Sequence, residues 1–315
     1  MSKKPKVGMW SGLTAVTAVL TAGAIVGTTV AFHYTTTVNN YLDADTYKII
    51  KGDSDEDTEY FKSDFTSDEE RESYEAELCA QVEAEGAALL KNDNNALPLA
   101  SGAKVSLFGH GSVDLMYGGT GSGSVDTSKA PNFKQALEDQ GIQVNSTLWD
   151  LYSSDDMMKN YSRITPAAIS DTLEANTQYA VNEAPWGKLS SAESSFADYG
   201  DAAIVVFSRS GGEGADLPSG ENGTNDSWIK GQEGDGNYLA LSAEEKELLQ
   251  NLKTLKDNGT FKKIIVLINS SNAIEMDFLN PEICGEDYGI DSAMWIGDVG
   301  QTGINGVAQL LAGKV

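Results

Sequence analysis

The sequence predicts an α/β fold, in which a mainly parallel sheet is covered by helices on both faces and is preceded by an N-terminal transmembrane helix. Short runs of consecutive apolar residues, such as AAIVVFS at 202–208, lack the polar alternation of a strand with one face in water. Segments with helical hydrophobic spacing alternate with these runs along the chain. The transmembrane helix is predicted by a long uncharged stretch at the very start.

The first 34 residues, 1–34, have the composition of a signal anchor. Lys3, Lys4 and Lys6 precede an uncharged stretch from Gly8 to Phe32, whose length is near the roughly 20 residues that cross a bilayer. Lysines on the short N-terminal side keep that side in the cytoplasm and favour export of the remainder. We expect a single-pass cell-membrane protein with an extracellular main domain. The alternative is a cleaved signal peptide and secretion.

Residues 35–76 are expected to form an acidic stalk or lead-in. Within them, DADTYKIIKGDSDEDTEYFKSDFTSDEERES carries many like charges that repel one another, and no hydrophobic period persists. The DSDED run offers oxygen ligands but lacks the glycine and the distal glutamate of an EF-hand loop. We interpret it as solvated charge and not as a calcium site.

The overall charge and the cysteine count exclude several classes of function. The chain has 315 residues, with 47 acidic and 22 basic side chains, and a net charge of −25. Such a field repels nucleic acid, so no nucleic-acid partner is expected. Cys79 and Cys284 form no C-x-x-C pair, and we expect no metal site and no cofactor. A disulfide between them stays open, although two separately packed thiols are favoured.

The main domain is expected at residues 77–315. An amphipathic helix leading into it is predicted by apolar residues in roughly helical steps, at Tyr74, Leu78, Val82, Leu89 and Leu90. Ser242 and Glu245 stand in the S-x-x-E relation of a capping box, which predicts the start of a later helix. Short apolar strands are predicted at 104–109, 202–208, 261–270 and 291–297, and further helices are predicted at 132–141 and 300–313.

Loops at the carboxyl ends of the strands are the expected place for a ligand, because such loops line the binding crevice of a parallel sheet. The first loop, FGHGSVDLMYGGTGSGSVD, contains His110. It matches neither the G-x-x-x-x-G-K-[ST] nor the G-x-G-x-x-G spacing of a nucleotide site. A loop after 261–270, INSSNAIEMDFL, has turn and cap chemistry and no G-x-S-x-G elbow.

The loop after 202–208 places Glu213 among glycines, directly behind an apolar strand. An ordinary solvated glutamate and a general acid/base at a loop tip are both consistent with this position. Arg209, at the start of the loop, either pairs with a carboxylate and holds the loop or faces solvent.

Taken together, these segments resemble the C-terminal α/β domain of glycoside hydrolase family 3, the β-glucosidase and β-xylosidase family. The matching text includes EAEGAALLKNDNNALPL, VSLFGHGS, YGGTGSGSV, AAIVVFSRSGGEGADLP, VLINSSNAIEMDFL and DSAMWIGDVGQTGINGVAQLLAGKV, in this order. The resemblance covers most of residues 77–315, and we expect the domain to be truncated at its C-terminus.

The resemblance implies a retaining glycosidase that hydrolyses the O-glycosyl bonds of a β-linked glycoside. In the family, an aspartate nucleophile lies on a separate (β/α)8 barrel, and this domain supplies the acid/base glutamate in an S-G-E-G segment. Glu213 is the matching position, although SGGEGAD carries an additional glycine; Glu221 and Glu233 are reserves. Beside such an aspartate, the pKa of the glutamate is expected to be raised by like charge and desolvation.

The implied enzyme is incomplete in this chain, because no room is left for a barrel, so the nucleophile is expected in a barrel downstream or in trans. Arg209 and His110 are further expected to contact substrate. The chain alone is expected to be inactive. A non-catalytic, surface-tethered carbohydrate-binding or docking module is the alternative function.

Overall fold

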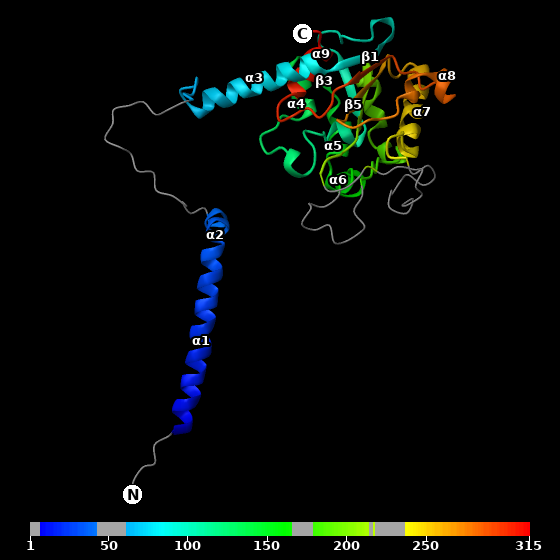
Figure 1. Cartoon of the computed structure of the whole chain (residues 1–315). Coiled ribbons are helices and arrows are strands. Elements are labelled where there is room, and N and C mark those ends of the chain that lie inside the picture. Colours follow the sequence, from blue (N-terminus) through cyan, green and yellow to red (C-terminus); the bar gives the residue numbers. More distant parts are fainter. Residues whose placement is uncertain (1–6, 43–60, 166–178, 214–216, 218–236) are drawn as a thin grey trace. The chain divides into compact units, whose positions relative to one another are not determined.

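The computed structural model describes residues 7–42, 61–165, 179–213, 217 and 237–315. The chain divides into two compact units, Met1–Ser63 and Asp64–Val315, which are described separately (Figure 1).

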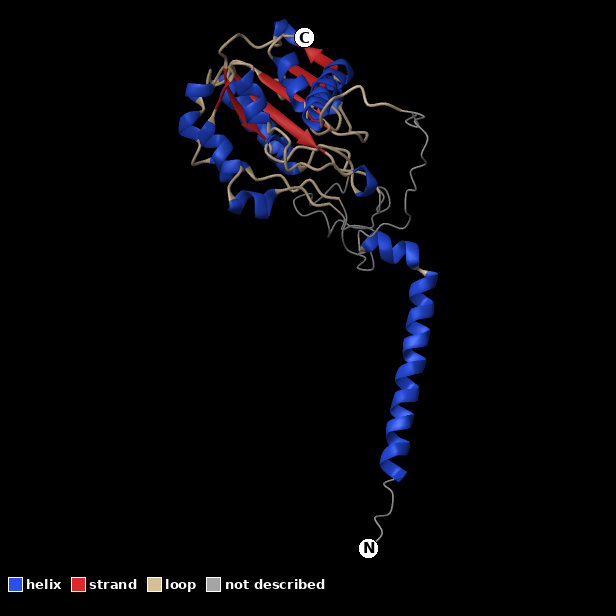
Figure 2. Cartoon of the chain, turned by 90° about the vertical axis from the view of Figure 1, so that its left-hand side faces the viewer, coloured by secondary structure: helices blue, strands red, loops and turns tan. Residues whose placement is uncertain are grey.

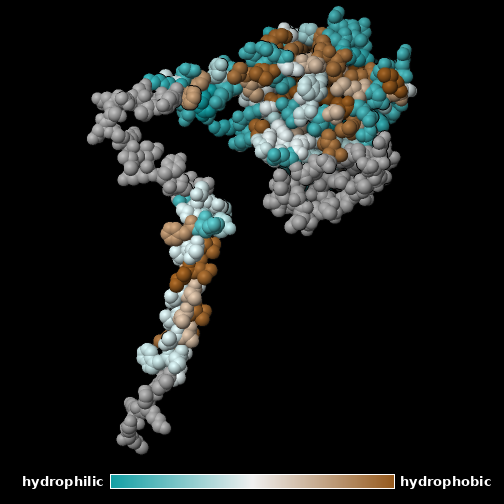
Figure 3. Space-filling view, viewed as in Figure 1, coloured by the Kyte–Doolittle hydropathy of each residue, from teal (hydrophilic) through white to brown (hydrophobic). Residues whose placement is uncertain are grey.

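The first unit is dominated by α1, Val7–His33, which is followed by the short α2, Thr35–Tyr41. The segment Trp10–His33 is long and apolar enough to cross a membrane, and Figure 3 shows apolar side chains along its surface. The hydroxyls of Thr14 and Thr17 donate to carbonyls one turn earlier, so these polar groups are satisfied within the helix. A signal sequence would have the same properties, so both interpretations of the N-terminus stay open.

The second unit is built on a six-stranded sheet with the order β1-β6-β5-β4-β2-β3. β1 is antiparallel to β6, and the other neighbours pair in parallel, so the predicted, mainly parallel sheet is confirmed. The strands are β1 (Ala88–Asn92), β2 (Lys104–Phe108), β3 (Gln143–Val144), β4 (Ala202–Ser208), β5 (Ile264–Asn269) and β6 (Ser292–Trp295).

Helices cover both faces of this sheet, as Figure 2 shows. On one face, Phe207 and Val266 pack against α5, α6 and α7; on the other, Val206 and Leu267 pack against α4 and α9. Every residue of β4 and β5 is buried, which explains why their sequences are apolar without alternation. The helices are α4 (Phe133–Asp139), α5 (Ser146–Tyr152), α6 (Asp155–Tyr161), α7 (Ala243–Asp257), α8 (Pro281–Cys284) and α9 (Ile304–Leu311).

The predicted capping box at the start of α7 is confirmed. The Ser242 hydroxyl accepts a hydrogen bond from the Glu245 backbone N–H, and the Glu245 carboxylate accepts one from the Ser242 N–H at 2.8 Å. This contact fixes the position of Glu245, whose carboxylate also reaches the loop that carries Glu213.

The segment before the first buried strand differs from the prediction. The helix, α3 (Asp68–Gly86), ends before Leu89 and Leu90, which belong to the edge strand β1. Tyr74, Leu78 and Val82, predicted as its apolar packing face, are exposed to solvent. The helical spacing of these apolar residues correctly predicted a helix, but the residues lie on the side of the helix that faces away from its own domain.

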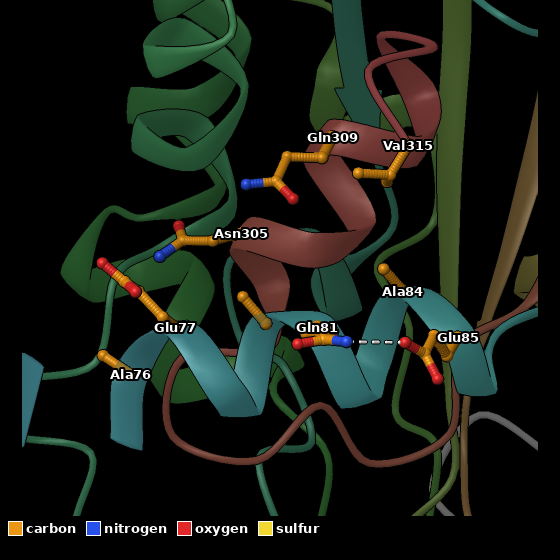
Figure 4. Close-up of a pocket in the computed structure, with 9 residues that line it drawn as sticks. Ala76, Glu77, Gln81, Ala84, Glu85, Asn305, Gln309 and Val315 are labelled. Atoms are coloured by element: carbon orange, nitrogen blue, oxygen red, sulfur yellow. Dashed lines mark hydrogen bonds between the residues drawn. The ribbon is translucent and has the colours of Figure 1, made fainter. Parts of the chain in front are cut away.

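α3 is held instead by small residues. The Thr302 hydroxyl donates to the Ala76 carbonyl, and a Cβ atom on Gly306 of α9 would collide with the Ala80 carbonyl oxygen. Ala84 lies on the same side, one turn further along, in the groove between the two helices (Figure 4). Alanine and glycine therefore let the two backbones approach closely, and this contact needs no large apolar side chain.

Gly306→Ala is expected to lower the free energy of unfolding by about 1–3 kcal/mol, because the added methyl group must push α3 away. This loss exceeds the gain of about 0.5–1 kcal/mol that alanine gives over glycine inside a helix. The matched control is Gly86→Ala in α3, where a Cβ atom meets nothing within 4 Å and no loss is expected. Denaturant titrations that show equal stability for the two variants would contradict the close contact.

Candidate active site

The carboxyl ends of β2, β4, β5 and β6 meet at one edge of the sheet, because these strands are parallel neighbours. The side chain of Asn269, at the end of β5, forms hydrogen bonds with the loops after β2 and β6. Its side-chain oxygen accepts from the Met116 N–H at 2.6 Å, and its amide donates to the carbonyls of Met116 and Gly297 at 3.0 and 2.7 Å. The sequence indicated only turn chemistry for Asn269, because its partners lie in loops distant along the chain.

Glu213 lies in the loop after β4 and is joined to the loop after β2. Its carboxylate accepts a hydrogen bond from the Ser122 N–H at 2.8 Å, and its carbonyl accepts one from the Thr120 hydroxyl at 3.0 Å. Thr120 and Gly212 form a single parallel bridge, and the Thr120 hydroxyl also lies 3.2 Å from that of the buried Tyr179. The two loops therefore hold the glutamate between them.

The glycines around the glutamate are explained by this close approach. Gly212 has a φ of 149°, and a Cβ atom there would lie 2.5 Å from the Thr120 hydroxyl oxygen. Across the contact, Gly121 has a φ of 69°, and a Cβ atom on it would collide with the Glu213 carboxylate. Larger residues at either position would separate the loops.

The electrostatic state of Glu213 is set by its contact with Ser122. The hydrogen bond from the Ser122 backbone, followed by that from its hydroxyl, holds the pKa of Glu213 below its ordinary value, against the opposing effect of desolvation. The sequence predicts a raised pKa for a glutamate beside an aspartate nucleophile. In this structure the neighbouring group is an N–H donor and not a carboxylate, so the shift has the opposite direction.

Arg209, at the root of the same loop, is fully buried, with 0% of its surface exposed. Its two terminal nitrogens form a bidentate ion pair with the Glu245 carboxylate at 2.8 and 2.7 Å. The remaining N–H groups donate to the carbonyls of Tyr238, Ala240 and Ser208, so all five guanidinium donors are engaged inside the protein. The sequence left two alternatives for Arg209, pairing with a carboxylate or facing solvent, and the structure shows the first.

Tyr238 is a residue of this site that sequence reasoning missed. Its hydroxyl accepts a hydrogen bond from the Ser210 N–H at 2.7 Å and donates one to the Ser210 carbonyl at 2.9 Å. Its ring packs against that of Tyr179, with 5.9 Å between centroids. Because a long polar segment separates Tyr238 from Ser210 in the sequence, no local pattern indicates the contact.

His110 is buried behind the same edge. Its backbone N–H and its ring Nδ1 both lie 2.9 Å from one oxygen of Glu183, which is also buried. Its Nε2 has no hydrogen-bond partner among the described residues. Glu183 was not predicted as a site residue, because its partner lies 73 positions earlier in the chain.

Two carboxyl groups, those of Glu83 and Asp298, influence each other where α3 lies beside the loop after β6. Burial, and then the negative charge of Asp298, raise the pKa of Glu83 to about 7. Burial also raises the pKa of Asp298, which accepts hydrogen bonds from the N–H and the hydroxyl of Ser271. Glu83 therefore carries a proton for much of the time near neutral pH.

The other candidate residues are placed as follows. Glu221 and Glu233 lie outside the described residues. Cys79 and Cys284 are both free thiols. In the part of the chain that the structure describes, no three His, Cys, Asp or Glu side chains are grouped so as to hold a metal ion.

We expect the carboxyl ¹³C shift of Glu213 to titrate with a pKa below its ordinary 4.5 in the full-length chain. Ser122→Pro, which removes the backbone donor, should return the pKa toward that value, whereas Ser122→Ala should keep most of the shift. Because the folded pKa is lowered, the contact stabilises the loop above the ordinary pKa, and this stabilisation is lost as pH falls through the folded value.

Glu213→Gln assigns the signal, and Glu70 is an internal control. Its pKa is lowered by Thr66, in a separate contact, and should be the same in all variants. An ordinary Glu213 pKa in the unmodified chain would show that Ser122 does not hold the carboxylate in solution.

Comparison with known proteins identifies the family of this domain. Residues 87–315 match the model of the glycosyl hydrolase family 3 C-terminal domain. A β-glucosidase of Ruminococcus albus is 30% identical over 242 residues, which are 76% of this chain and 22% of that protein. β-Glucosidase A of Butyrivibrio fibrisolvens is 30% identical over 256 residues, which are 76% of this chain and 27% of that protein.

Solved structures agree with the sequence matches. A β-glucosidase from Paenibacillus barengoltzii has a TM-score of 0.56 at 27% identity, over 76% of this chain and 23% of that one. β-Glucosidase 3B from Thermotoga neapolitana, solved in complex with α-D-glucose, shares the fold with a TM-score of 0.55 at 24% identity, over 77% and 30% of the two chains. The chain thus spans less than a third of these proteins, and through its C-terminal-type domain it belongs to glycosyl hydrolase family 3.

Proposed function

We propose that this chain supplies the acid/base glutamate, Glu213, of an exported, membrane-tethered retaining β-glycosidase that cleaves β-glucosides. The observation that supports this best is the position of Glu213. It lies in a glycine-flanked loop at the carboxyl edge of the sheet, in a domain whose relatives are β-glucosidases. The loop is anchored by buried groups at Arg209 and Ser210, while the glutamate itself is exposed.

The chemistry requires a second carboxyl group. In a retaining mechanism, a protonated glutamate donates its proton to the glycosidic oxygen as an aspartate about 5 Å away attacks the sugar. The resulting carboxylate then removes a proton from water, which displaces the aspartate. We propose that the aspartate belongs to a (β/α)8 barrel downstream of this chain or in trans.

Glu213 must change its protonation state to perform this role. Held by Ser122, it is ionised near neutral pH and cannot donate a proton. Release from Ser122, together with the approach of an anionic aspartate in a site closed to water, would raise its pKa. The proposed enzyme therefore moves Glu213 away from Ser122 when the barrel and the sugar are in place.

A second candidate function is carbohydrate binding without catalysis. The same ionised carboxylate favours it, because a fixed acceptor can bind a sugar hydroxyl without any proton transfer. Titration of the chain with glucose and β-linked oligosaccharides, in the absence of a barrel, separates the two. Saturable binding that is lost in Glu213→Gln supports the binding module.

The catalytic proposal is tested by joining the chain to the barrel domain of a family member, fused after Val315 or added in trans. Glu213→Gln is expected to slow the hydrolysis of an alkyl β-glucoside by about 10²–10⁴-fold, because the leaving group then departs without a proton. In Glu213→Ala, azide should partly restore turnover of aryl β-glucosides with good leaving groups, since azide needs no general base to attack.

Glu138→Gln, at a half-buried position on α4 where the carboxylate pairs with Lys134, is the control and should keep full activity. Full activity of Glu213→Gln in an assembly that hydrolyses the substrate would assign the acid/base role to another residue.

The proposed membrane tether predicts where the chain is found. In its cell of origin, the full chain should stay in the membrane fraction after alkaline carbonate extraction and should be digested by protease added outside. Removal of residues 2–33 should leave it soluble in the cytoplasm, because α1 is then missing. Recovery of the unmodified chain in the medium, with a new N-terminus inside residues 25–45, would establish a cleaved signal peptide instead.

A further inference from the structure

α3 presents its large apolar side chains to solvent. Tyr74, Leu78 and Val82 are 53%, 43% and 62% exposed, and their spacing of four residues places them along one side of the helix. We call these three residues the α3 stripe. The aromatic ring of Tyr74 contacts the ring of Phe65, with 5.3 Å between centroids, but about half of the surface of Tyr74 stays accessible.

The stripe is not explained by the packing of α3 on its own domain. Ala80, which contacts α9, lies two residues from Leu78 and Val82, or about 200° around the helix at 3.6 residues per turn. A surface helix normally buries its large apolar residues and turns small or polar residues outward. Here the arrangement is reversed, which is typical of a helix that a second body covers.

The surroundings of the stripe are acidic. Beside it, a groove of about 530 Å³ runs between α3 and α9, and Glu77, Gln81 and Glu85 form its α3 wall (Figure 4). No lining residue of this groove is lysine, arginine or histidine. At the other end of the stripe, the guanidinium of Arg71 is paired with Glu75 at 2.8 Å and with Asp68 at 3.4 Å.

The acidic residues beside the stripe indicate which kind of partner can cover it. A second copy of this chain would bring its own Glu77 and Glu85 against the same surface, and the like charges would repel. A helix with lysine or arginine beside an apolar seam would cover the stripe and place its cations in the acidic groove. We propose that the α3 stripe, with the groove beside it, is a docking surface for a basic amphipathic helix of a partner protein.

The probe for this proposal is a synthetic helical peptide of about 18 residues, with leucines at helical spacing and lysines on both flanks. Its dye-labelled form is titrated with the full-length chain in phosphatidylcholine nanodiscs, and empty nanodiscs are the blank. We expect saturable binding that weakens as salt is added. Leu78→Gln with Val82→Gln should weaken it about tenfold or more, and Glu77→Gln with Glu85→Gln should reduce both affinity and salt dependence.

Ile283→Gln is the matched control, because Ile283 is equally apolar and 69% exposed but lies on α8. It should bind the peptide as the unmodified chain does. The proposal is overturned if a peptide with glutamates in place of the lysines binds equally well, or if the stripe variants keep full affinity. Self-association that sedimentation detects and the stripe variants abolish would also overturn it, by identifying a second copy as the occupant.

Discussion

The candidate site depends on the buried ion pair between Arg209 and Glu245. Arg209 directly follows the carboxyl end of β4, and Glu245 lies in the first turn of α7. The ion pair therefore joins the end of the strand to the start of the helix. Two charges without exposure are tolerated only when each is fully hydrogen-bonded, and the five donors of Arg209 meet this condition. The ion pair therefore fixes the path of the backbone directly after β4, and Glu213 lies four residues further along this path.

Much of the fold could be predicted, because the signals that define it are local. Continuous apolar runs predicted β4 and β5, and Ser242 with Glu245 predicted the start of α7. α3 shows where such reasoning fails. A helical period identifies one side of a helix but not whether that side faces the domain or the solvent, and the alanine and glycine contacts that hold α3 carry no hydrophobic signal.

The candidate site was less predictable, because its contacts join segments distant along the chain. The sequence placed Glu213 in a glycine-rich loop after a strand, but Gly121, Thr120 and Ser122 gave no sign that they lie against it. Tyr238 and Glu183 were missed for the same reason. The direction of the pKa shift also depends on a spatial neighbour, and a hydrogen bond from a backbone N–H cannot be read from a residue pattern.

A series of polar interactions connects the inner side of α3 with the loops at the carboxyl edge of the sheet. On α3, the pKa of Glu83 is raised by burial and then by the negative charge of Asp298, which follows β6. Asp298 in turn accepts two hydrogen bonds from Ser271, which follows β5. Because the pKa of Glu83 is raised in the folded chain, the free energy of unfolding is expected to fall as pH rises from the ordinary pKa of a glutamate through about 7, where the buried carboxyl loses its proton.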